Sequence, residues 1–82
     1  DFAWLDLIAC LKATGMEIRE IREFVRWNME GDETIPSRLE LLRSCRKETL
    51  RQMAQLQKCL DKLDHKIAFY EQKVERLAKP GA

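Results

Sequence analysis

The feature that most constrains this chain is a heptad pattern that runs from residue 35 to residue 77 without changing phase. Its thirteen positions are spaced alternately four and three residues apart, and eleven of them carry apolar or aromatic side chains. This spacing places one narrow apolar stripe on one face of an α-helix. We interpret the stripe as the seam of a dimer, formed by Ile35, Leu39, Leu42, Met53, Leu56, Leu60, Leu63, Ile67, Tyr70, Val74 and Leu77.

The length of the predicted helix requires a partner. No Gly or Pro stands between Ser37 and Lys79, and a helix of that length spans roughly 65 Å at about 1.5 Å per residue. A chain of 82 residues has too small a core to cover such a stripe by itself. We therefore predict a two-stranded coiled coil in a homodimer. The alternative, a bent helical hairpin within one chain, needs a turn for which the sequence supplies no breaker.

Two positions of the stripe are polar, Arg46 and Thr49. A polar seam residue often fixes the register or orientation of the paired helices. Alternatively, the seam opens there and Arg46 extends to water, and the residues favour neither interpretation. Outside the stripe, Leu41 and Leu50 are apolar, which suggests that a second element packs against the outer side of the coil.

Two short helices are predicted ahead of the long one, over residues 1–13 and 17–29, each with an apolar face. Gly15 ends the first and Gly31 the second, since glycine suits the left-handed residue that closes a helix. The predicted class is all-α. Its parts are a helix pair over 1–31, the long helix over 32–79 and a tail over 80–82.

Single residues at the joint between the pair and the long helix have predicted roles. Thr34 is a suitable N-cap for the long helix. Trp27 lies nearly opposite the apolar face of its own helix, and we expect it to pack at the joint rather than to stack on a ligand.

Composition excludes several classes of protein. Fifteen basic and fourteen acidic side chains give a net charge of +1, which is not the global signature of a nucleic-acid binder, although it does not exclude one. The longest apolar run, residues 7–11, is too short to cross a bilayer. One histidine, no Gly-rich loop and no nucleophile–base pair argue against an enzyme, so we expect no catalytic residue, cofactor or metal ligand.

The termini and the cysteines suggest where the protein works. Three widely spaced cysteines, Cys10, Cys45 and Cys59, do not form a secreted disulfide framework. No signal peptide is visible, and we expect a reducing cytoplasm. Because the chain begins with Asp1 rather than Met, we expect that residue to be the boundary of a fragment.

An ordered set of segments resembles the MerR-type transcription regulators. The segment WLDLIACLKATGM is similar to the third helix of that family, and EIREI to the start of its fourth. The entry into its dimerisation helix is similar to residues 31–35 and 38–42, and the far end of that helix is similar to residues 60–67 and 70–71. The resemblance covers nearly the whole chain and keeps every break in phase.

This resemblance implies a promoter-bound homodimer whose long helices run antiparallel. It also implies that an effector changes the angle between two DNA-binding heads and so distorts the promoter for RNA polymerase, an indirect partner. The helix-turn-helix of the family is not in this chain, so we expect promoter DNA to be reached only through a missing N-terminal segment. Within the chain, candidate phosphate contacts are Lys12, Arg19, Arg22 and Arg26.

The cysteines bear on the signal that such a regulator senses. The resemblance disfavours a metal-sensing branch, because its grouped thiolates are missing. The pattern Cys10-Leu11-Lys12 ahead of Gly15 resembles the NmlR and AdhR branch, which senses aldehyde and thiol stress. Cys10 is therefore the candidate effector-sensing thiol at a packed joint, and the alternative is a small hydrophobic residue at a helix edge.

The function predicted from these observations is dimerisation and signal transmission in a MerR-type regulator. The alternative is a coiled-coil adaptor that binds other proteins and has no DNA or effector role. An adaptor would not need the helix pair, and this distinguishes the two. We expect Cys45 and Cys59 to lie half-covered by a partner helix on the flanks of the coil, and His65 has no assigned role.

Overall fold

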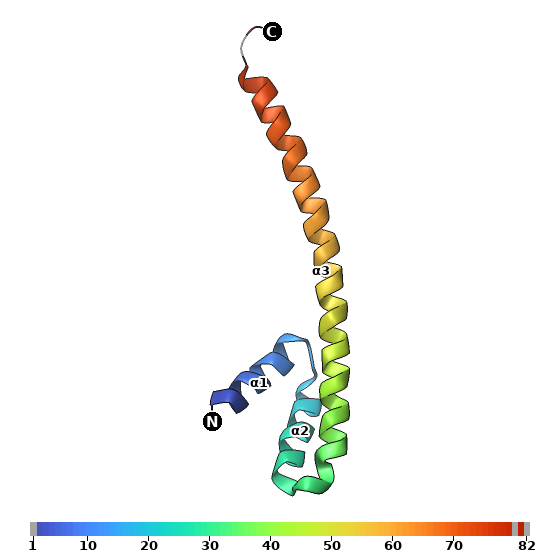
Figure 1. Cartoon of the computed structure of the whole chain (residues 1–82). Helices are drawn as coiled ribbons and strands as arrows, with labels where there is room; N and C mark the ends of the chain where they lie inside the picture. The colour runs from blue at the N-terminus through green and yellow to red at the C-terminus, as the bar shows by residue number, and fades with distance from the viewer. Residues whose placement is uncertain (1, 80, 82) are drawn as a thin grey trace. The chain divides into compact units, whose positions relative to one another are not determined.

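Three α-helices make up the described part of the chain, residues 2–79 and 81, in this computed structural model (Figure 1). They are α1 (Phe2–Ala13), α2 (Ile18–Glu30) and α3 (Ile35–Ala78), with a short 3-10 turn η1 (Asp32–Thr34) before α3. No strand occurs among these residues. The all-α class and the single long helix are confirmed. The chain divides into two compact units, Asp1–Gln52 and Met53–Ala82.

The helix boundaries follow the predicted breaks closely. Gly15 has φ +91° and Gly31 has φ +116°, and both values lie in the region that glycine adopts without steric cost. The Gly15 amide donates to the Lys12 carbonyl at 3.0 Å, which closes the last turn of α1. The second helix begins one residue later than predicted, with Glu17 at its N-cap. Asp1 of the predicted first helix, and Pro80 and Ala82 of the predicted tail, lie outside the described residues.

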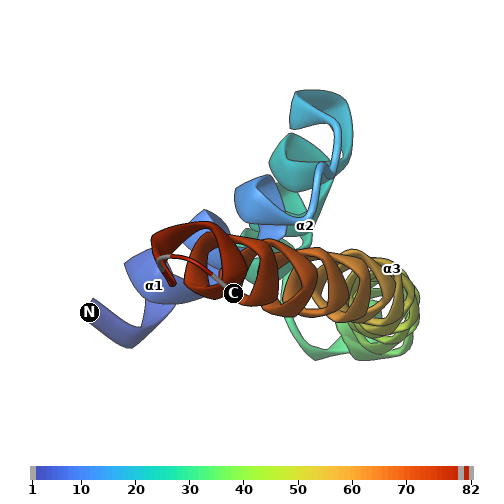
Figure 2. The ribbon, with the colours of Figure 1, turned by 90° about the horizontal axis from the view of Figure 1, so that it is seen from above.

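A small core holds the unit Asp1–Gln52 together. Leu11, Phe24 and Ile21 are buried, and the Trp4 ring stacks on Phe24 with centroids 5.7 Å apart. Around them pack the half-buried side chains Leu7, Ile8, Met16, Trp27, Leu41, Leu42 and Cys45. In Figure 1, α2 lies alongside the start of α3, and Figure 2 shows the same region from above.

The contacts of α3 within its own chain bear on three expectations. Leu41 packs on the helix pair as predicted, but Leu50 is 47% exposed. Leu42, which was assigned to the dimer seam, also packs on the core of its own chain. Cys45 is already half-buried against the core of its own chain, and its cover by a partner helix stays a prediction. The reason is geometric, because the helix pair packs against one flank of α3 and reaches the nearest seam residue.

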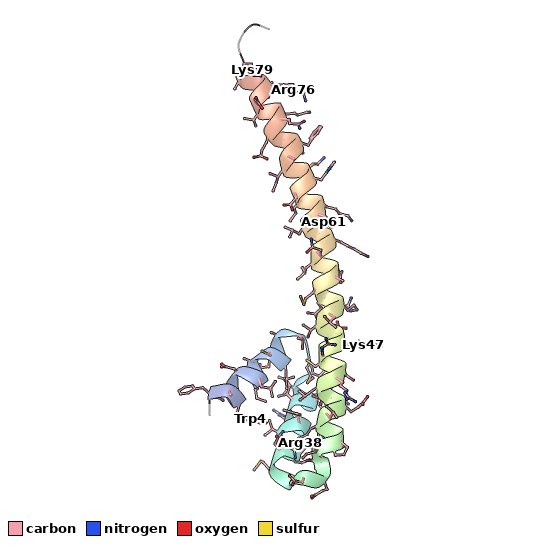
Figure 3. The ribbon with its side chains drawn as sticks, viewed as in Figure 1. Trp4, Arg38, Lys47, Asp61, Arg76 and Lys79 are labelled. Carbon is pink, nitrogen blue, oxygen red and sulfur yellow. The ribbon has the colours of Figure 1, made fainter. Side chains whose placement is uncertain are left out.

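A polar cluster joins α2 to α3, and we call Asn28, Gly31, Thr34 and Arg38 the junction clamp. The Arg38 guanidinium donates to Thr34 Oγ1 at 3.0 Å, Asn28 Oδ1 at 3.0 Å and the Gly31 carbonyl at 2.9 Å. The last turn of α2 contains no basic residue. Arg38, which Figure 3 labels near the start of α3, therefore brings a positive charge to the negative end of α2.

Thr34 directly precedes α3, as expected of a capping residue, but its hydroxyl serves the junction clamp. Its oxygen lies 2.7 Å from both the Trp27 and the Gly31 carbonyl oxygens and can donate its proton to either. The same oxygen accepts from Arg38. The side chain is buried, so these contacts replace the water that its hydroxyl would otherwise bind.

Candidate functional site

The predicted seam is a row of exposed apolar side chains on α3. Ten of its eleven members are exposed, from 45% at Leu39 to 86% at Leu77, and Leu42 is half-buried. Large apolar side chains that stay exposed in a contiguous row mark a surface for a partner. In the unit Met53–Ala82, every described residue is exposed, so its apolar seam residues are not buried within the chain.

An aromatic and cationic cluster flanks this part of the seam and was not predicted. Phe69 lies outside the heptad seam and is 43% exposed. The Nζ atoms of Lys66 and Lys73 lie 5.4 and 5.1 Å from its ring centroid, which is cation–π distance. Tyr70 meets Phe69 edge-on, with centroids 5.8 Å apart. The sequence signal that would have found this cluster is lysine placed three residues before and four residues after Phe69.

The turn between α1 and α2 is attached to α3 through one residue, and we call Thr14, Cys45 and Gln52 the Thr14 contact. Thr14 Oγ1 lies 3.2 Å from Cys45 Sγ and donates to the Leu11 carbonyl at 2.9 Å. The Gln52 amide donates to the Thr14 carbonyl at 2.7 Å. These contacts join the turn after α1 to α3 at two points, Cys45 and Gln52.

Glu48 supports the Thr14 contact from α3. Its carboxylate accepts from Arg51 Nη2 at 2.7 Å, from Arg51 Nε, whose proton is shared between both oxygens at 3.1 and 3.0 Å, and from Gln52 Nε2 at 3.2 Å. Hydrogen bonds from Arg51 first, and from Gln52 second, lower the pKa of Glu48 to about 2. Gln52 therefore lies between a Glu48 carboxylate and the Thr14 carbonyl, and its amide orientation is fixed by both.

Cys10 lies on the exposed surface of α1 in this chain, and its role at a packed joint of a full-length regulator stays a prediction. Its thiol is open to solvent and to reagents. Its carbonyl oxygen accepts from the Thr14 amide at 3.1 Å. Cys59 is also exposed, whereas Cys45 is half-buried. Cys45, on α3, is therefore the cysteine that contacts the helix pair, through Thr14.

The four candidate phosphate contacts are all exposed. Arg19 pairs with Glu17 at 3.4 Å, and Arg26 pairs with Glu23 and with Glu30. No ion pair to Lys12 or Arg22 occurs in the described part of the chain. The positive charge of α2 is thus partly neutralised on its own surface, and Lys12 and Arg22 are the freest cations of the set.

Among residues 2–79 and 81, no group of three or more His, Cys, Asp or Glu side chains is arranged to hold a metal ion. In the same residues, no helix is both long and apolar enough to cross a membrane.

Comparison with known proteins places this architecture among regulators. A family model described as "MerR, DNA binding" matches residues 2–66. A Haemophilus influenzae protein described as an uncharacterized HTH-type transcriptional regulator is 42% identical over 71 residues, which are 87% of this chain and 53% of that protein. The chain thus spans about half the length of that curated relative.

Two solved structures resemble the chain. A crystal structure of HiNmlR, a MerR family regulator lacking the sensor domain and bound to promoter DNA, has 42% identity and a TM-score of 0.83, and the match covers 96% of this chain and 59% of that one. A transcriptional regulator of the MerR family from Bacillus thuringiensis has 42% identity and a TM-score of 0.78, and covers 84% and 60%.

Proposed function

The chain belongs to the MerR family of DNA-binding transcription regulators, and we propose that it supplies the dimerisation helix and a signal-transmitting helix pair of a homodimeric regulator. In this proposal residues 1–31 are the end of the DNA-binding head and residues 32–79 are the dimerisation helix. The single observation that supports it most is the row of ten exposed seam residues. A protein-binding adaptor without a DNA role is disfavoured by the family assignment.

The seam pairs with a second copy of itself. An apolar stripe of heptad spacing matches an identical stripe, and each seam leucine buried in a dimer contributes about 1.5–3 kcal/mol. Sedimentation equilibrium of residues 1–82 tests this at micromolar concentration. A mass of twice the 9.7 kDa chain is expected, and a single species at the chain mass would refute the dimer.

The paired helices run antiparallel. Family resemblance carries this part of the proposal, with a small contribution from Arg43, whose charge meets Asp64 or Glu71 of a partner in that orientation. Arg38 does not bear on the orientation, because the junction clamp holds its side chain.

A spin label at Arg76→Cys, in a chain whose three native cysteines are replaced by alanine, distinguishes the two orientations. If the helices cross near residue 56, an antiparallel pair separates the two labels by roughly 60 Å at about 1.5 Å per residue. Labels within about 20 Å of each other would indicate a parallel pair, since both copies would then stand at the same height.

Promoter contact involves this chain as well as any preceding segment. The family model described as DNA binding covers residues 2–66, so the expectation that DNA is reached only through a missing helix-turn-helix is too narrow. Lys12 and Arg22 are proposed to contact phosphates, because they are exposed and have no ion pair among the described residues. Arg19 and Arg26 contribute less, since acidic neighbours compete with the phosphates. RNA polymerase responds indirectly, through the distorted promoter.

Cys10 is the proposed receiver of an aldehyde or thiol-reactive signal. Its exposure lets an electrophile reach the sulfur, and the following turn is bound to α3 through the Thr14 contact. A change at Cys10 therefore has a hydrogen-bonded route to the dimerisation helix.

A promoter-reporter assay of the full-length regulator tests this role. Cys10→Ala should abolish induction by aldehydes while promoter affinity stays within about twofold, because an exposed side chain contributes little to folding. Cys59→Ala is the matched control, since Cys59 is equally exposed. Full induction of the Cys10→Ala regulator would exclude the sensing role.

A further inference from the structure

A groove lies between α2 and the start of α3, outside the seam, and its apolar lining residues also pack on the core. Its volume is about 740 Å³, and the side chains that line it include Met16, Glu20, Glu23, Trp27, Glu40 and Leu41. That volume falls within the roughly 300–1,000 Å³ of sites for drug-sized ligands. We propose that this α2–α3 groove binds a small amphipathic organic cation, at a site separate from Cys10.

The apolar part of the groove centres on Trp27. Its side chain packs against the core of the unit and is half-buried, so its position is fixed while part of it stays open to the groove. Leu41 and Met16 lie beside it on the lining. An indole face attracts a cation more strongly than the other aromatic rings do. This wall therefore suits a ligand that is both apolar and positively charged.

The charges of the groove select the sign of the ligand. Three carboxylates, those of Glu20, Glu23 and Glu40, line it against one guanidinium, that of Arg19. Arg19 is paired with Glu17 outside the groove. Arg26 already pairs with Glu23, whereas within the described residues no ion pair holds Glu20 or Glu40. The attraction for a cationic ligand therefore rests mainly on these two carboxylates. An anion of the same shape would be repelled.

The groove stays accessible in the proposed dimer. Its lining on α3 includes Glu40, Leu41 and Ser44, which lie outside the heptad seam. On α2, Trp27 follows Ile18 by nine residues, which at about 100° per residue puts the two on opposite sides of the helix. Ile18 belongs to the exposed apolar side of α2 together with Met29. A partner bound to the seam, or to the exposed apolar side of α2, would therefore leave the groove open.

Isothermal titration calorimetry of residues 1–82 with tetraphenylphosphonium tests the proposal. We expect saturable binding of one cation per chain. Tetraphenylborate, an anion of the same shape, should not bind at the same concentrations, and the neutral triphenylphosphine oxide should bind several-fold more weakly. Equal affinity for the neutral compound, or no binding of the cation, would overturn the proposal.

A paired set of variants locates the site. Glu20→Gln combined with Glu40→Gln should weaken tetraphenylphosphonium binding about fivefold, because each exposed carboxylate contributes modestly. Asp61→Asn combined with Asp64→Asn removes the same charge from α3 outside the groove and should leave the affinity unchanged. Circular dichroism checks that both variants remain folded. Equal weakening in the two variants would show general charge attraction and would refute a site in the groove.

Discussion

The two parts of α3 differ in where their partners lie. In residues 35–52, α3 packs through Leu41, Leu42 and Cys45 on the core formed with α1 and α2. In residues 53–79 every side chain is exposed, although the same heptad repeat continues. The two parts of this one helix therefore have different roles. Its first part packs on the core of the chain, and its second part presents an exposed apolar row, which is the main surface of the proposed dimer.

The largest effect is expected for a variant that disrupts the exposed seam in residues 53–79 alone. Leu60→Asp should shift residues 1–82 from dimer to monomer at micromolar concentration, measured by sedimentation equilibrium. Each chain would lose one buried leucine, so the dimer loses roughly 3–6 kcal/mol at about 1.5–3 kcal/mol per residue. Ala54→Asp adds the same charge on α3 outside the seam and should leave the dimer intact. A stable Leu60→Asp dimer would mean that the seam is not the interface.

The next variant disrupts only the core that α1 and α2 form with residues 35–52 of α3. Phe24→Ala should destabilise the helix pair by about 3–5 kcal/mol, because it removes a buried ring from a core of few residues. Urea unfolding followed by circular dichroism measures the change, and sedimentation should still detect a dimer. Phe69→Ala truncates an exposed ring on α3 and should cost less than half as much. Equal loss of dimer in both variants would contradict the division of α3.

A smaller effect is expected at the junction clamp. Arg38→Lys keeps the charge but cannot reproduce the three directed hydrogen bonds to Thr34, Asn28 and Gly31. We expect a loss of about 1.5–3 kcal/mol, measured as a lower urea midpoint. Arg43→Lys, at an exposed site on the same helix, serves as the control and should change the midpoint little. An unchanged midpoint for Arg38→Lys would mean that the clamp does not hold α2 to α3.

The smallest effect concerns pH and the Thr14 contact. The pKa of Glu48 is lowered from 4.5 to about 2 by its hydrogen bonds, first from Arg51. A lowered pKa means that the contribution of the ionised carboxylate is present above pH 4.5 and is lost as the pH falls toward 2. The side-chain amide signals of Gln52 in NMR spectra should shift with a midpoint near pH 2, where the Glu48 carboxylate of the folded chain takes up its proton. In Glu48→Gln they should stay unchanged, and a shift centred near pH 4.5 in the native chain would refute the lowered pKa.

Periodicity in the sequence was enough to predict the helices and their breaks. Gly15 and Gly31 lie at the predicted ends with positive φ, because few other residues tolerate that backbone. The heptad also selected the seam residues that the structure leaves exposed. Both kinds of prediction depend on local geometry, which a sequence carries directly. Leu42 is the one seam residue that is not exposed, since it is half-buried against the core. A periodic pattern assigns a side chain to a face of the helix but does not say what covers it.

The contacts between helices could not be predicted in the same way. Heptad position assigned Cys45 to a flank of the coil, yet Cys45 meets Thr14, and no sequence pattern indicated that Arg38 binds the end of α2. Their partners lie on other elements, and only the packed arrangement brings the atoms together. The groove around Trp27 was missed for the same reason, since its lining comes from residues 16–27 and 36–44.

The stacking of Trp4 on Phe24 has a spectroscopic consequence. The two tryptophans of the chain occupy different surroundings, since Trp4 lies against a core ring and Trp27 lines the groove. With Trp4→Phe, the remaining emission reports polarity at the groove alone. With Trp27→Phe, it reports the separation of α1 from α2. The chain thus carries two intrinsic optical probes, one for each face of α2, without any attached label.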